Sequence, residues 1–70
     1  MMKEKYLSAL HKRYIADVET ARANLETYFN NTVGVAEHLA PLESMDKLVG
    51  QIAEAEDKLR IIREEINELT

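Results

Sequence analysis

The sequence has no cysteine and no tryptophan, and it contains one proline and two glycines in 70 residues. Without cysteine there is no disulfide framework and no thiolate metal site. The two histidines, His11 and His38, are too far apart in sequence to form a zinc-binding His-x-x-x-His pair. We therefore expect neither a metal nor another cofactor.

Catalytic motifs are also missing. The chain has no glycine-rich phosphate loop, no His-Glu-x-x-His motif and no visible Ser–His–acid constellation. Its many acidic residues are most simply solvated charges on helix surfaces. We do not expect an enzyme.

No stretch approaches the roughly 18 to 20 apolar residues that a membrane-spanning helix needs. Lysines near the N-terminus are not followed by the apolar run of a secretory signal. We therefore expect a soluble, cytoplasmic protein that does not bind a membrane.

The net charge of −4 is unevenly distributed. Residues 1–13 carry a balance of +3, residues 14–43 of −4 and residues 44–70 of −3. Because neutralisation of phosphates supplies most of the affinity for nucleic acid, an acidic chain is a poor candidate for that partner.

The strongest pattern lies in residues 45–69, where apolar residues recur in steps of three and four. This spacing places one narrow apolar stripe on a helix and predicts a partner helix. The stripe consists of Met45, Leu48, Ile52, Ala55, Leu59, Ile62, Ile66 and Leu69. Between these positions, three acid–base pairs at a spacing of four residues favour the helix: Glu54–Lys58, Glu56–Arg60 and Glu43–Lys47.

Residues 3–30 show a second stripe and a composition that favours helix. Its positions are Leu7, His11, Tyr14, Val18, Ala21, Leu25 and Tyr28. Leu10, Ile15 and Phe29 widen this stripe. The two predicted helices, about 3–30 and about 40–69, are of similar length, which suits a hairpin.

The connector, about residues 31–39, joins these helices. An asparagine pair can end the first helix, and Pro41 fits the first turn of the second. In an antiparallel hairpin, the basic start of the first helix lies beside the acidic end of the second. The sequence thus predicts an all-α fold, an antiparallel, coiled-coil-like two-helix hairpin.

One hairpin leaves apolar residues without cover, because Phe29, Val49 and Ile61 lie off the main stripes. A chain this short buries only about 60% of its unfolded surface, so association is the remaining remedy for a thin core. We expect a dimer or larger assembly, such as a four-helix bundle of two hairpins, because Leu59, Ile62 and Ile66 need more cover than one helix gives. The predicted oligomer interface is Leu48, Ile52, Leu59, Ile62, Ile66 and Leu69.

Several side chains admit two interpretations. His11 is either a pH-sensitive or ligand-binding core residue or, as we favour, a boundary residue with one nitrogen in water. The three tyrosines, Tyr6, Tyr14 and Tyr28, could form a platform for bases. We favour core positions for Tyr14 and Tyr28, which leaves Tyr6 free for a partner. The basic residues of 1–13 either form a patch for nucleic acid or an acidic protein or, as we favour, are neutralised by the acidic end of the second helix.

The connector is the predicted binding site, on the residues Asn31, Thr32, Gly34, Glu37 and His38. The start of the second helix exposes free N–H groups and the positive end of the helix dipole, which favours an anion. The other interpretation, which we favour, is a turn held by its own caps, with Glu37 filling that position.

The connector sequence Asn31-Thr32-Val33-Gly34-Val35-Ala36-Glu37-His38, with the later segment 53–59, resembles small uncharacterised helical-hairpin proteins of tailed bacteriophages. These carry an Asn-Pro-Val-Gly-(Ile/Val)-Gly-Glu-His type segment between two helices. The chain departs from that pattern at Thr32, Ala36 and Leu39, where the family has Pro, Gly and often Pro. The resemblance covers residues 24–60 and implies a phage or prophage origin, and therefore the host cell cytoplasm, but no activity.

The function that these observations favour is a non-enzymatic interaction protein, a phage accessory factor acting as a homo-oligomer. A first alternative is a counter-defence protein that sequesters a small anionic ligand or blocks a host protein complex. A second alternative is a structural component of the virion.

Overall fold

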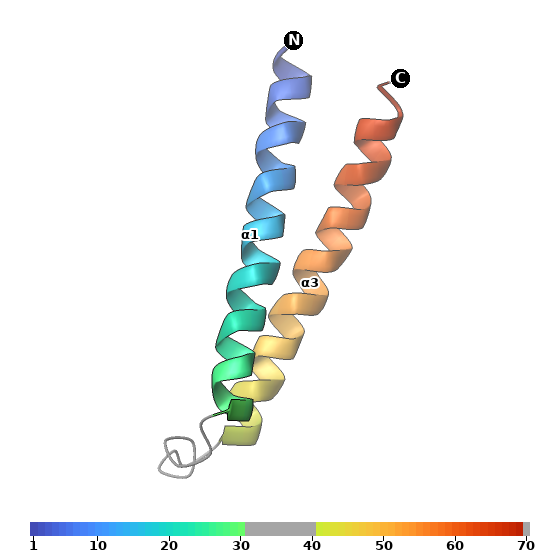
Figure 1. Cartoon of the computed structure of the whole chain (residues 1–70). Helices are drawn as coiled ribbons and strands as arrows, with labels where there is room; N and C mark the ends of the chain where they lie inside the picture. The colour runs from blue at the N-terminus through green and yellow to red at the C-terminus, as the bar shows by residue number, and fades with distance from the viewer. Residues whose placement is uncertain (31–40, 70) are drawn as a thin grey trace.

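The computed structural model is a hairpin of two helices, and it describes residues 1–30 and 41–69. Helix α1 spans Met2–Asn30 and helix α3 spans Pro41–Asn67. The helices lie side by side and run in opposite directions, so that both chain ends lie at one end of the hairpin (Figure 1). The predicted all-α, antiparallel hairpin is confirmed.

The helix ends lie within two residues of the predicted ones. Pro41 is the first residue of α3, where its missing N–H and fixed φ cost little. At the other end, the Leu69 N–H donates to the Ile66 carbonyl at 3.0 Å, a tighter bond than the α-helical one. Helix α3 therefore ends at Asn67, before the predicted residue 69.

The two helices pack through the two predicted stripes. Every position of the first stripe is buried or half-buried, and in the second stripe only Leu69, which lies beyond the end of α3, is exposed. The buried side chains among the described residues are Leu7, Ala21, Ile52, Ala55, Leu59 and Ile62. None of them is fully enclosed, since the core is a single layer between two helices.

The hairpin is a rod. Its radius of gyration is 15.9 Å, whereas a compact 70-residue domain would have about 11 Å. Its extents are 50 × 14 × 14 Å. In this shape each helix buries one stripe against the other and leaves both of its flanks to solvent.

Ion pairs along α3 agree in part with the prediction. The Lys58 ammonium lies 3.4 Å from a carboxylate oxygen of Glu54, as expected. Between Glu43 and Lys47, both of them described residues, there is no ion pair.

Arg60 differs from the prediction, because it does not pair with Glu56. Its guanidinium donates to Asp57 at 2.8 Å and to Glu64 at 3.0 Å. The hydrogen bond and the charge of Asp57, followed by those of Glu64, raise the pKa of Arg60. Glu56 is thereby left for a partner on the other helix.

The basic start of α1 and the acidic end of α3 lie at the same end of the hairpin, as predicted (Figure 1). Within residues 1–30 and 41–69, however, no ion pair joins Lys3, Lys5, Lys12 or Arg13 to the glutamates of the last α3 turns. Glu64 is instead held by Arg60. We conclude that the packed stripes set the antiparallel orientation.

Candidate functional site

The predicted connector site, Asn31, Thr32, Gly34, Glu37 and His38, lies outside the described residues. The described residues that can form a site belong to the two helices and their flanks.

The six residues predicted as an oligomer interface have different environments. Ile52, Leu59 and Ile62 are buried, whereas Leu48 and Ile66 are half-buried and Leu69 is exposed. The expectation that Leu59 and Ile62 need more than one partner helix for cover is wrong, because α1 alone covers them. A second copy would find apolar surface elsewhere on the hairpin.

The aromatic residues and His11 follow the prediction for core positions. His11, Tyr14 and Tyr28 are half-buried in the α1 stripe, and Tyr6 is exposed. The ammonium of Lys58 lies 5.5 Å from the centroid of the Tyr14 ring, at the edge of the packed stripe. This contact joins the helices on one flank of the hairpin.

On the other flank, Arg22 of α1 donates to Glu56 of α3. The guanidinium nitrogen lies 2.6 Å from the carboxylate oxygen, and both side chains are exposed. Within the described part of the chain, this is the ion pair that joins the two helices, and it shows which residues of α1 and α3 lie level with each other. Because the helices are antiparallel, a residue that follows Arg22 on α1 lies level with the residue that precedes Glu56 on α3 by the same number of positions.

This register places Phe29 opposite Val49. Phe29 follows Arg22 by seven residues and Val49 precedes Glu56 by seven, so each lies two turns nearer the connector on the same flank. Leu42 lies two further turns along α3. These three side chains are exposed, at 62% for Phe29, 76% for Leu42 and 51% for Val49. We call Phe29, Leu42 and Val49 the apolar flank.

Toward the chain ends, the same register predicts that Ile15 lies level with Arg63. Both residues do line one shallow hollow on this flank, together with Val18, Glu19, Glu56 and Leu59. The register drawn from the Arg22–Glu56 pair therefore also holds two turns away, at Ile15 and Arg63. The exposed residues around this hollow, Glu19, Glu56 and Arg63, are charged, whereas Phe29, Leu42 and Val49 are exposed in the half near the connector.

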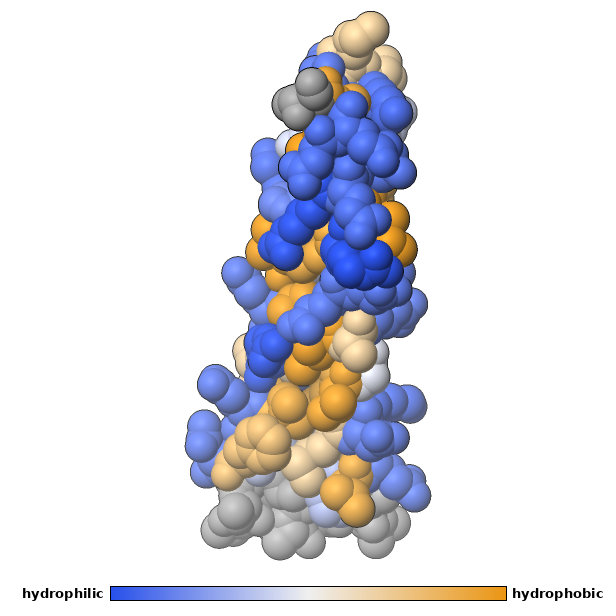
Figure 2. All heavy atoms as spheres, turned by 90° about the vertical axis from the view of Figure 1, so that its right-hand side faces the viewer, coloured by the Kyte–Doolittle hydropathy of each residue, from blue (hydrophilic) through white to orange (hydrophobic). Residues whose placement is uncertain are grey.

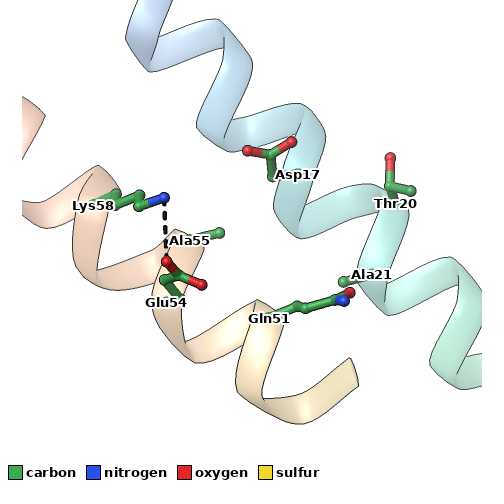
Figure 3. Close-up of a pocket in the computed structure, with 7 residues that line it drawn as sticks. All are labelled: Asp17, Thr20, Ala21, Gln51, Glu54, Ala55 and Lys58. Atoms are coloured by element: carbon green, nitrogen blue, oxygen red, sulfur yellow. Dashed lines mark ion pairs between the residues drawn. The ribbon is translucent and has the colours of Figure 1, made fainter. Parts of the chain in front are cut away.

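The opposite flank is polar. A hollow between the helices is lined by Asp17, Thr20, Ala21, Gln51, Glu54, Ala55 and Lys58 (Figure 3). In this view the Lys58 ammonium reaches the Glu54 carboxylate, and the Asp17 carboxylate lies across the hollow on α1 (Figure 3). A further hollow toward the connector is lined mainly by polar residues, among them Asn24, Thr27 and Lys47. Water-exposed groups of this kind need no partner.

The space-filling view shows where apolar surface gathers on one long side of the hairpin. Hydrophobic side chains form a band between hydrophilic ones, and the band is broader in the half nearer the connector (Figure 2). Contiguous exposed apolar surface is a mark of interaction sites, whereas single exposed apolar residues are ordinary.

The described residues show neither a metal-binding group nor a membrane-spanning helix. Across residues 1–30 and 41–69, no three histidine, aspartate or glutamate side chains gather closely enough to hold a metal ion. Neither of the two described helices combines the length and the hydropathy that crossing a membrane requires.

The sequence interpretation identified Phe29 and Val49 as uncovered but missed Leu42 and the Arg22–Glu56 pair. The available signal was the seven-residue spacing of Leu42, Val49 and Glu56 on one helix and of Arg22 and Phe29 on the other. These positions flank the stripe on the same side, so their alignment follows once the register is known.

Comparison with protein-family models, with curated proteins and with solved structures gave no match to this chain.

Proposed function

We propose that this chain is a non-enzymatic interaction protein that works as a homo-oligomer. The single observation that carries the proposal is the apolar flank, Phe29, Leu42 and Val49, whose side chains are exposed on one side of the helix pair. Exposed apolar side chains aligned on one flank favour association, because fully burying one from full exposure gains about 1.5–3 kcal/mol and these three are between 51% and 76% exposed.

The shape of the molecule supports the same conclusion. A rod only two helices thick has little core for its size, and small helical hairpins gain stability by packing into bundles. The opposite flank is polar, and its residues Asp17, Gln51 and Lys58 favour water. Association should therefore occur through the apolar flank.

Equilibrium sedimentation of Val49→Gln tests the proposal. We expect the unaltered chain to be a dimer or larger at micromolar concentration. The substitution places an amide in the apolar flank, so association should weaken roughly tenfold or more while the helical circular dichroism signal stays.

Ile61→Gln is the matched control. Ile61 is exposed to a similar extent, but it follows Lys58 by three residues and so lies toward the polar flank. Its substitution should leave association unchanged. The proposal is contradicted if the unaltered chain sediments as a monomer at micromolar concentration and unfolds cooperatively.

A further inference from the structure

The charges around the apolar flank select one orientation for a second copy. Two hairpins can pack flank to flank about a two-fold axis along the rod, which places α1 against α3 of the second copy. Alternatively, the axis crosses the rod and places α1 against α1 and α3 against α3. The two arrangements bring different residues together.

With the axis along the rod, each residue of the second copy lies at the same position along the rod as in the first copy. Phe29 then lies against Val49 of the second copy, because these two residues are level within one hairpin. Arg22 likewise lies against Glu56 of the second copy, and two copies of this ion pair form a four-membered charge network at the middle of the interface.

Glu19 provides a further complementary contact in this arrangement. It lines the flank hollow, three residues before Arg22, and Arg60 follows Glu56 by four residues on α3. The two therefore lie at nearly the same height, and Glu19 of each copy meets Arg60 of the other. In this register Phe29 thus meets Val49, and the acids Glu56 and Glu19 meet the bases Arg22 and Arg60.

With the axis across the rod, the matches are lost. Full overlap would place Leu42 and Val49 over the stretch of α3 that carries Arg60 and Arg63. Overlap limited to the connector ends would join the apolar flanks but leave most of each rod outside the interface. Both versions give up either the charge matches or the area.

The area available along the rod is adequate for a specific dimer. One long side measures 50 by 14 Å, close to the ~800 Å² that each partner contributes to an interface of standard size. Resting on the proposed self-association, we infer that the partner of the apolar flank is a second copy of this chain, related by a two-fold axis along the rod.

Because the chain has no cysteine, crosslinking between introduced thiols tests this orientation. Glu19→Cys chains and Arg60→Cys chains of different tag length are unfolded together, refolded as a mixture and treated with a short bismaleimide. We expect crosslinked dimers that contain one chain of each kind. Glu19→Cys alone and Arg60→Cys alone should stay uncrosslinked.

Crosslinking of Glu19→Cys to itself, or of Arg60→Cys to itself, would overturn the inferred orientation. So would the absence of mixed dimers in a sample that sediments as a dimer, and the proposed function would then still stand. A monomer in sedimentation would instead remove the proposed function, so the two failures are separable.

Discussion

Ala21 of α1 and Ala55 of α3 are the most buried of the described core residues, at 3% and 4% exposed, and they line the same hollow between the helices (Figure 3). Methyl side chains at such positions allow a short distance between helix axes. The hairpin therefore depends on small residues here as much as on large ones elsewhere in the stripes.

Replacing Ala55 by Leu should lower the free energy of unfolding by about 1–3 kcal/mol, because the larger side chain must push the two helices apart. Urea unfolding measures the change. Ala53→Leu is the control, since Ala53 lies on the exposed face of the same helix. Equal stability of both variants would show that the helices have room at this position.

Two neighbouring isoleucines of α3 should differ in their contribution to stability. Ile62 is buried at 8% exposed, whereas Ile61 is 44% exposed. Ile62→Ala should cost about 2–5 kcal/mol through the lost contacts and the remaining cavity, and Ile61→Ala should cost under about 1 kcal/mol. Thermal unfolding of the two variants compares them directly. Similar losses of stability would contradict a core that contains Ile62 but not Ile61.

Gly50 is a local weakness of α3, and Gly50→Ala should stabilise the hairpin by about 0.5–1 kcal/mol. The residue is exposed within the helix, and a Cβ placed on it meets nothing within 4 Å. The gain comes mainly from the reduced freedom of the unfolded chain. A lower midpoint in urea for this variant would indicate a contact at Gly50 in the assembled protein.

The Arg22–Glu56 pair should contribute little to stability despite its short distance. Both side chains are exposed, so a double-mutant cycle of Arg22→Ala and Glu56→Ala should give a coupling energy of about 0.2–1 kcal/mol. Dilute protein keeps contacts between copies out of this measurement. The coupling should decrease in 1 M salt, where exposed charges are screened. A coupling of several kcal/mol that resists salt would be inconsistent with an exposed pair.

The sequence was sufficient to predict the two helices, their orientation and the stripes through which they pack. Apolar residues spaced by three and four positions lie on one face of a helix, and burying that face requires a partner helix. Ile52 and Leu59 lie on this face and are buried. Pro41 likewise marked the start of α3 through its fixed φ.

Pairing of exposed charges was less predictable. Arg60 has acids at several suitable spacings, and the choice of Asp57 and Glu64 over Glu56 depends on where Arg22 lies on the other helix. That register is a tertiary property. The apolar flank depends on it as well, because Phe29 and Val49 become neighbours only when the two helices are aligned.

The start of α1 and the end of α3 lie at the same end of the rod, and this has a mechanical consequence. A force that pulls Met2 away from Asn67 acts across the stripes at their open end, so it loads one layer of contacts at a time. The hairpin should therefore unzip at low force from its ends toward the connector, so that Leu7 loses its contacts first, Ile62 next, and Ala21 and Ala55 later. A second copy packed along the same rod would carry part of this load in every layer.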